Sequence, residues 1–260
     1  MSVLASFLDS FMDALISALS LFSIRVAGQP PDDDHGFGHE KAESIAALFQ
    51  FVFIGGSAMV LAGFAVQRMW TGATVAHAQA GMWIMLCTTT VSWLLSAHMR
   101  RVARRTHSMA LGADSLHYAT DVWTNLGVVA ALALVQISGA AWVDGACSLG
   151  IAAYVLRAVI EPLRNALDIL MDRELADGER TAIVTAIEGH DPRVRGYHKL
   201  RTRRSGTRRF VEFHVLIDSA VSFQEAHDIT ESLVDRIRKD MPGTWVIAHT
   251  DPDTAPYEDD

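Results

Sequence analysis

Cysteine is scarce in this chain, and positively charged residues are outnumbered by negatively charged ones. Only Cys87 and Cys147 are present among the 260 residues, and they form no CxxC pair. A disulfide framework or a thiolate metal site therefore has no support, and we interpret both as buried small apolar residues. The net charge of −8 disfavours non-specific binding to nucleic acid, which needs a basic surface. We expect no nucleic-acid partner.

Signals of several other protein classes are also missing. The N-terminus lacks the charged start and small-residue cleavage site of a signal peptide. Neither a nucleophile motif nor a phosphate-binding loop appears in the sequence. An ATP-driven pump is therefore disfavoured.

Apolar residues are abundant but unevenly distributed. They make up 50% of the chain, and the mean hydropathy is +0.19. In the first two-thirds they form runs close to the roughly 20 residues that a helix needs to cross a bilayer. We predict a bundle of five membrane-spanning helices, at about residues 3–26, 42–66, 81–97, 113–137 and 142–159.

The last part of the chain is charged and mixed, as in a soluble domain. We divide the chain into a transmembrane domain, residues 1–171, and a cytoplasmic domain, residues 172–260. Periodicity and turn residues predict helices and strands in the order αββαβ, at residues 175–188, 196–203, 208–217, 222–241 and 245–249. This order predicts a two-layer, ferredoxin-like α+β domain with two helices on one face of a three-stranded sheet.

Basic residues give the orientation in the membrane. Four arginines lie between residues 100 and 105, which we interpret as a loop after the third span. The positive-inside rule places this loop in the cytoplasm. Counting spans then places the acidic, histidine-bearing segment 32–39 and the C-terminal domain on the same side. The N-terminus would lie outside without an export signal, so we expect a further span before Met1.

Ionisable residues interrupt two of the predicted spans. Asp9 and Asp13 lie in the first, and His117 and Asp121 lie in the fourth. Each pair is four residues apart and so shares one face of its helix. An ionisable residue within a span costs about 2.5–3.5 kcal/mol on insertion scales, so it usually marks a pathway or a paired site. Three carboxylates and an imidazole from two helices supply four ligands for one tetrahedral ion. The alternative is a set of structural polar residues that neighbouring helices satisfy.

A series of short runs carries a resemblance to a known family. These runs are DSFMD, PDDDHGFGHEKAES, ADSLHYATD, HKLRTRRSG, FVEFHVLID, EAHDI and IAHTDP. Together they resemble the cation diffusion facilitator family, most strongly its bacterial zinc and ferrous-iron efflux pumps. The resemblance implies six membrane helices, of which five are visible here, followed by a cytoplasmic domain. It also implies homodimers in the bacterial inner membrane that exchange metal for protons.

The resemblance also implies roles for individual residues. The transport site in the membrane would consist of Asp9, Asp13, His117 and Asp121. A second site in the cytoplasmic loop would consist of Asp32, His35 and His39, for which a solvated acidic turn is the alternative. Metal sites of the cytoplasmic domain would use His198, His214, His249 and Asp251, with His227 as a further ligand. Scattered surface or core histidines are the alternative there.

The ligand types bear on substrate and mechanism. Imidazole and carboxylates suit Zn²⁺, with Fe²⁺, Cd²⁺ and Mn²⁺ as further candidates, and the lack of thiolates disfavours copper(I). Protons compete with metal for the same atoms. We therefore predict a proton-coupled divalent cation exporter, a metal/proton antiporter, that carries zinc and binds it in its cytoplasmic domain. We expect no enzymatic activity, because a closed four-ligand site leaves no open position for hydrolysis. The alternative is a shortened, non-transporting metal-binding or regulatory protomer of the same fold.

Overall fold

The computed structural model describes residues 2–71, 79–138 and 142–254 of the chain. These residues fall into two compact units, Met1–Leu167 and Asp168–Asp260, and each unit is described by itself. The boundary between functional domains, placed above after residue 171, stays a prediction.

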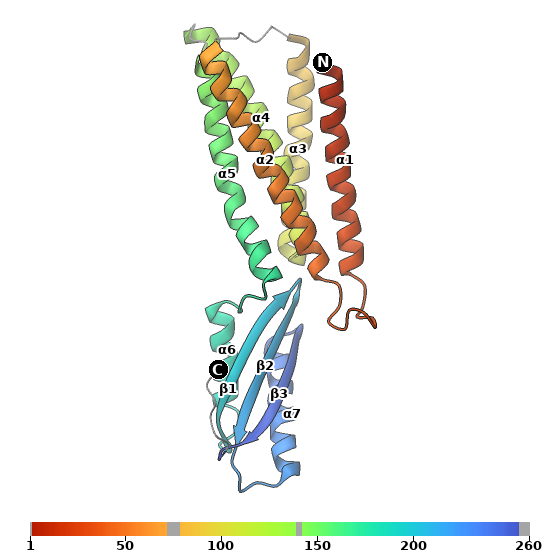
Figure 1. Cartoon of the computed structure of the whole chain (residues 1–260), viewed down its shortest axis with the longest axis vertical. Helices are drawn as coiled ribbons and strands as arrows, with labels where there is room; N and C mark the ends of the chain where they lie inside the picture. The colour runs from red at the N-terminus through yellow and green to blue at the C-terminus, as the bar shows by residue number, and fades with distance from the viewer. Residues whose placement is uncertain (1, 72–78, 139–141, 255–260) are drawn as a thin grey trace. The chain divides into compact units, whose positions relative to one another are not determined.

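The first unit is a bundle of long helices (Figure 1). The described residues form α1 (Ser2–Ala27), α2 (Lys41–Thr71), α3 (Gln79–Thr106), α4 (Met109–Ser138) and α5 (Trp142–Leu170). The predicted helical bundle is confirmed. By length and hydropathy alone, two stretches of the described chain pass as membrane spans, Lys41–Gln67 and Trp142–Leu170.

Two of the predicted boundaries are wrong. The arginines between residues 100 and 105 lie within α3, not in a loop, because arginine and alanine are strong helix formers and the helix continues past its apolar part. Helix α5 passes through Pro162 to Leu170 instead of ending near residue 159. A proline removes one backbone hydrogen bond and kinks a helix, but it need not end it.

Apolar and small polar contacts hold the helices of the bundle together. Phe51 and Ile54 of α2 are buried in one cluster with Val159 of α5. Helices α3 and α4 are joined by reciprocal hydrogen bonds, in which Ser96 Oγ donates to the Ser115 carbonyl over 2.8 Å and Ser115 Oγ donates to the Ser96 carbonyl over 3.1 Å. Such close serine contacts are typical of packed membrane helices.

Both cysteines are free thiols. Cys147 on α5 is partly buried, whereas Cys87 is exposed on α3. The expectation that both are buried was therefore wrong for Cys87. Helix α3 exposes other apolar side chains nearby, including Leu86 and Leu94, because a membrane helix is apolar on its outer face as well.

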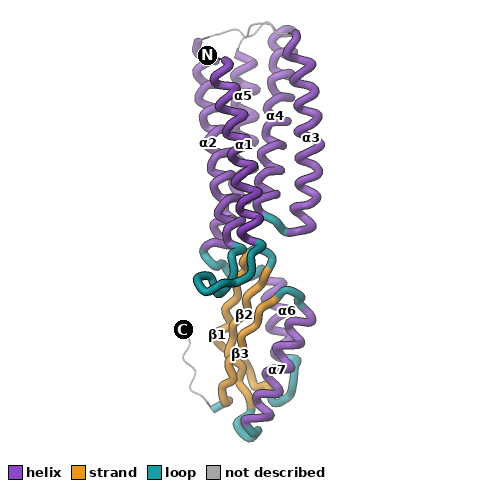
Figure 2. Tube along the Cα trace, turned by 90° about the vertical axis from the view of Figure 1, so that its right-hand side faces the viewer, coloured by secondary structure: helices purple, strands orange, loops and turns teal. Residues whose placement is uncertain are grey.

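The second unit is a two-layer α+β domain (Figure 2). Its elements are α6 (Asp177–Glu188), β1 (Val194–Ser205), β2 (Arg208–Ile217), α7 (Phe223–Asp240) and β3 (Thr244–Pro252). The sheet order is β1-β2-β3, with β1 antiparallel and β3 parallel to β2. The predicted αββαβ order and three-stranded sheet are confirmed.

One face of this sheet is covered by α6 and α7. Phe213 and Val215 of β2 are fully buried with Ile183 of α6 and Leu233 of α7. Alternate residues of a strand point to opposite faces. His214, which lies between Phe213 and Val215, therefore points to the face that these helices leave open.

Candidate metal sites

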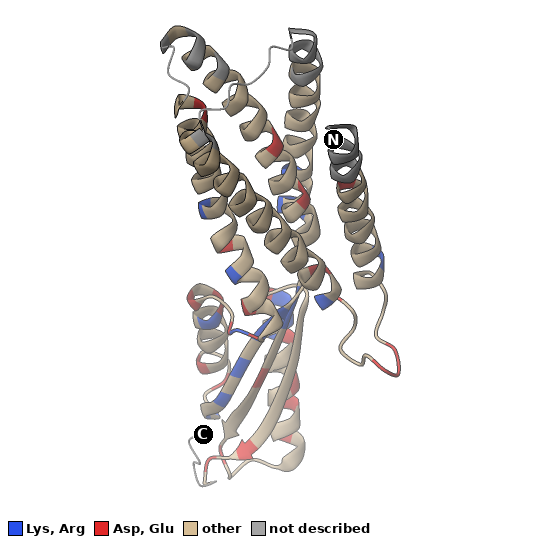
Figure 3. Cartoon of the chain, turned by 45° about the horizontal axis from the view of Figure 1, so that its top comes forward, with Lys and Arg blue, Asp and Glu red and all other residues tan. Residues whose placement is uncertain are grey.

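The first candidate site joins α1 to α4 inside the helical bundle. His117 Nε2 lies 3.0 Å from Asp13 Oδ1 and 4.0 Å from Asp121 Oδ2. The imidazole is only 14% exposed, whereas the two carboxylates are 46% and 41% exposed. Asp9 falls on α1 one turn before Asp13, but its side chain lies outside the described residues. Figure 3 shows acidic residues within these otherwise largely uncharged helices.

A further carboxyl group lies on the same face of α4. Asp114 is three residues before His117 and seven before Asp121, and it is only 6% exposed. Residues at this spacing line one side of a helix. The motif ADSLHYATD contains the signal for this group, but the predicted ligand set did not include Asp114.

The start of α4 is fixed by a glutamate of α2. Ser108 Oγ accepts the Leu111 N–H and donates to Glu43 Oε2 over 2.7 Å. Glu43 Oε2 also accepts the Met109 N–H over 3.1 Å. Two of the free N–H groups at the start of α4 are thereby satisfied. This contact fixes the position of α4 along its axis relative to α2, and therefore the position of His117.

The second candidate site lies in the loop between α1 and α2. Asp32 Oδ1 accepts the backbone N–H groups of Asp34 and His35, as in an Asx-type turn. His39 Nε2 lies 3.1 Å from Asp32 Oδ2 and 3.1 Å from His35 Nδ1. The structure thus brings all three predicted loop ligands together.

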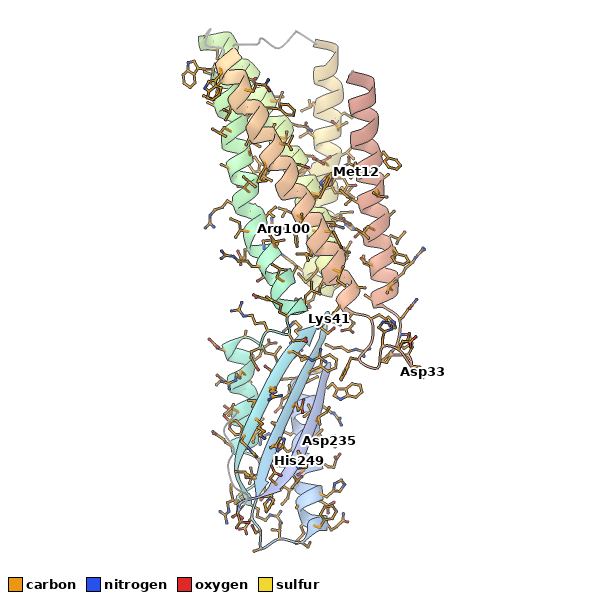
Figure 4. The ribbon with its side chains drawn as sticks, viewed as in Figure 1. Met12, Asp33, Lys41, Arg100, Asp235 and His249 are labelled. Atoms are coloured by element: carbon orange, nitrogen blue, oxygen red, sulfur yellow. The ribbon has the colours of Figure 1, made fainter. Side chains whose placement is uncertain are left out.

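The negative charge of the loop favours the binding of a cation. Hydrogen bonding to the His35 backbone, aided by the His35 and His39 side chains and opposed by slight burial, lowers the pKa of Asp32. The Asp32 carboxylate and the His35 side chain are more than half exposed. Figure 4 labels Asp33 in the same loop. An exposed, ionised cluster is suited to attracting metal ions, and metal binding here stays a prediction.

The third candidate site is a row of histidines across the sheet of the second unit. His198 of β1 pairs with His214 of β2, which pairs with His249 of β3. All three side chains therefore share the open face of the sheet. The row depends on an irregularity in β1 between His198 and Arg201, where Lys199 has a φ of 53°.

One carboxylate connects the row. Asp251 Oδ2 lies 2.9 Å from His198 Nε2 and 2.7 Å from His214 Nδ1, and its Oδ1 lies 3.1 Å from His249 Nε2. Partial burial acts to raise the pKa of Asp251, but hydrogen bonds to His214 and His198 and the nearby charge of His249 outweigh it and lower that pKa. His249, which is labelled in Figure 4, has a side chain that is 64% exposed, so the row is open to solvent at β3.

His227 does not join this row. It is exposed on α7, which covers the opposite face of the sheet. The described residues that gather are His198, His214 and Asp251, with His249 beside them. The sequence motif placed His227 in the right domain, but helix α7 carries it to the other layer.

The fold and these clusters define a class of protein: a helical bundle with a carboxylate–imidazole site, joined to an α+β domain with a histidine row. Residues 1–171 match the family model described as the cation efflux transmembrane domain. Residues 175–253 match the model described as the cation efflux protein, cytoplasmic domain. The chain belongs to the cation diffusion facilitator family of cation efflux proteins.

Similar proteins span nearly the whole chain. It is 41% identical to the cation-efflux pump FieF of Pectobacterium atrosepticum over 254 residues, which cover 98% of this chain and 84% of that relative. It is 38% identical to the cation-efflux pump FieF of Shewanella oneidensis over 251 residues, which cover 96% of this chain and 84% of that relative. Among solved structures, a CzrB chain is 29% identical with a TM-score of 0.29, covering 30% of this chain and 96% of its own.

Proposed function

We propose that this protein exports divalent metal cations from the cytoplasm in exchange for protons, at a site formed by Asp9, Asp13, His117 and Asp121. The observation that carries the proposal is the 3.0 Å contact between His117 Nε2 and Asp13 Oδ1. It brings metal-ligating atoms of α1 and α4 together inside apolar helices, where ionisable groups without a shared partner are costly. The relatives that are named cation-efflux pumps support export as the direction of transport.

Zinc is the leading substrate. Imidazole nitrogen and carboxylate oxygen are ordinary zinc ligands, and Zn²⁺ is usually four-coordinate in such sites. The same donors accept Fe²⁺ and Cd²⁺. Three carboxylates around one ion more than balance its two positive charges, so the ion is held without a further anion.

Protons supply the release step. Metal binds only deprotonated ligands, so protonation of His117 and its neighbouring carboxylates expels the ion. A site that loads metal on the cytoplasmic side and protons on the other side then moves the two in opposite directions. The proposal requires that both ions reach Asp13 and Asp121, whose carboxylates are less buried than the His117 imidazole.

The histidine row serves as a zinc site in the cytoplasmic domain. Its nitrogen donors and the carboxylate of Asp251 fit zinc, and all lie on the open face of the sheet. Zinc there would fix the three strands to one another and prepare that face for contact with a second copy. We place the protein in the bacterial inner membrane as a homodimer, with the α+β domain in the cytoplasm.

Metal flux tests the proposal directly. The full chain is reconstituted in liposomes that contain a zinc-sensitive dye, and it is compared with Asp121→Asn and with the matched control Glu161→Gln, an exposed acid of α5. We expect Asp121→Asn to reduce the initial zinc flux at least about 10-fold and the control to leave it unchanged. Equal flux from Asp121→Asn and the unmutated chain would contradict the site. Zinc binding without flux from any of the three chains would instead support the non-transporting regulatory protomer.

A further inference from the structure

Three buried polar side chains from three different helices converge beside the transport site. They are Ser20 of α1 and Gln50 of α2, each 2% exposed, and Asp114 of α4, 6% exposed. The Asp114 carboxyl faces the side chains of Ser20 and Gln50. None of the three belongs to the proposed ligand set, so these groups have no role in the mechanism described above.

Two of these residues have unsatisfied polar atoms. Apart from the Asp114 carboxyl group that both side chains face, Ser20 Oγ and both amide atoms of Gln50 are buried without a hydrogen-bond partner in the described part of the chain. Buried polar groups without a partner are rare in native proteins, and each one calls for a bound water, an ion or another functional reason. A carboxyl group beside a side-chain amide and a hydroxyl group can supply the oxygen donors that a hard divalent cation accepts, once the amide turns its oxygen towards the ion.

The position of these groups follows from the topology of the bundle. Helix α4 begins at the end of the bundle where α1 ends and α2 begins (Figure 1), and Glu43 of α2 contacts Ser108 there. Asp114 lies about 4.5 Å nearer to that end than His117 along the helix axis. Ser20 likewise lies between Asp13 and the end of α1. Asp114 and Ser20 therefore lie between the transport site and the end of the bundle that carries the 32–39 loop, with Gln50 beside Asp114.

We propose that Ser20, Gln50 and Asp114 form a second, oxygen-only station that binds a divalent cation on its way from the loop side to His117. This inference rests on the proposed export function and adds a step to its pathway. The Asp114 carboxylate supplies charge, and the Gln50 amide oxygen and Ser20 hydroxyl replace part of the water shell of the ion. Without imidazole or thiolate the station binds more weakly than the four-ligand site, so it passes the ion on.

Binding of Mn²⁺ tests the station, because carboxylate and carbonyl oxygens suit this ion. The full chain carries Asp32→Asn, Asp121→Asn and Asp251→Asn, which disable the three clusters already described. Loss of the electron paramagnetic resonance signal of aqueous Mn²⁺ then reports binding to the remaining groups. We expect about one bound Mn²⁺ per chain.

Variants of Gln50 separate the station from other weak sites. Gln50→Leu removes both amide atoms and should weaken Mn²⁺ binding at least about 10-fold, whereas Gln50→Glu adds a second carboxylate and should strengthen it. Gln67→Leu, at an exposed position of the same helix, is the matched control. The stronger binding expected of Gln50→Glu keeps the test decisive even if Gln50→Leu fails to fold.

Either of two results would overturn the station: no Mn²⁺ binding in the triple variant, or binding that neither Gln50 substitution changes. Zinc flux by the unmutated chain is measured separately. A chain that binds Mn²⁺ in this way but moves no zinc contradicts the exporter and supports the station. A chain that exports zinc but shows no such binding contradicts the station alone.

Discussion

Asp251 is the carboxylate that connects the histidine row of the cytoplasmic domain. Its two oxygens reach three imidazoles that belong to three different strands. The spacing of Asp251 and His249, two residues apart on β3, places both on one face of the sheet. Removal of this one side chain should therefore disturb the whole row.

Asp251→Asn tests this role. The amide keeps the shape of the side chain but loses the negative charge, so the zinc dissociation constant of the row should rise at least about 10-fold. Competition with a chelating dye measures it in a full chain that also carries Asp32→Asn and Asp121→Asn. Asp235→Asn, at an exposed side chain of α7, is the matched control. Unchanged zinc affinity in Asp251→Asn would contradict the assignment of the row.

Asp191 makes a separate contribution that depends on pH. The side chain and then the backbone N–H of Arg193 hydrogen-bond to its carboxylate and lower the pKa of Asp191 to about 2. A carboxyl group with a lower pKa in the folded state stabilises that state above its unfolded pKa of about 3.9, and this effect disappears as the pH falls towards the folded value. Asp191→Asn should therefore weaken the start of β1 at pH 5 and above, with a difference that shrinks towards pH 2.

Amide hydrogen exchange in the full chain measures this difference. The Val194 N–H, which donates to the Asp191 carbonyl, is the reporter. Asp235→Asn serves again as the control. A difference between the chain and Asp191→Asn that stays constant from pH 5 to pH 2 would show that the ion pair is not its source.

At the scale of helices, the cap between α2 and α4 holds the start of the helix that carries the proposed ligands His117 and Asp121. Glu43 contacts the first turn of α4, and His117 lies two turns further along the same helix. Negative charge at a helix N-terminus is also favourable to the helix dipole. A change at residue 43 should therefore affect both stability and the position of His117.

Glu43→Ala should lower the free energy of unfolding of the chain by about 1–2 kcal/mol, because the Met109 N–H and the Ser108 hydroxyl lose their acceptor. Glu43→Gln keeps an acceptor oxygen but loses the charge, so its effect should be smaller. Thermal unfolding in detergent compares both with Glu161→Ala. Equal midpoints for Glu43→Ala and Glu161→Ala would contradict the cap.

Close approach of α2 and α5 depends on Gly145. A Cβ atom at this position would overlap Met69 Cγ and lie 2.9 Å from the Ala65 backbone carbonyl oxygen. The methionine side chain can move, but the backbone cannot move easily. Gly150, on the same helix, has no heavy atom of the described chain within 4 Å of the same position.

Gly145→Ala should therefore destabilise the bundle by about 1–3 kcal/mol, as overpacking does. Gly150→Ala, its matched control, should be neutral or stabilising by up to about 1 kcal/mol, because alanine is the better helix former. Thermal unfolding in detergent separates the two. A Gly145→Ala chain as stable as Gly150→Ala would show that the helices do not pack as described.

At the scale of the whole molecule, the sequence predicts the helices and strands better than it predicts the contacts between them. Apolar runs located the helices of the first unit, and the αββαβ order of the second unit is confirmed. The end of α3 was missed because hydropathy falls at its arginines while helix propensity stays high. Hydropathy and helix propensity must therefore be considered together to find where such a helix ends.

The candidate sites show the same limit. Spacing of four residues predicted that His117 and Asp121 share a face, but the approach of Asp13 depends on how α1 packs on α4. The histidine row depends on the register of three strands and on the irregularity at Lys199. No local sequence motif predicts either of them. The predicted ligand set lacks Asp114, because its neighbours Ser20 and Gln50 lie on two other helices and no local pattern relates them.

The central claim is that metal leaves the His117 site when protons enter it. The most direct measurement records zinc flux and proton flux together, in liposomes that hold a zinc dye and a pH dye, for the unmutated chain, Asp121→Asn and Glu161→Gln. The account predicts proton movement opposite to zinc, dependent on zinc, and lost for both ions in Asp121→Asn alone. Zinc flux with no opposing proton flux, or proton flux that persists in Asp121→Asn, would contradict it.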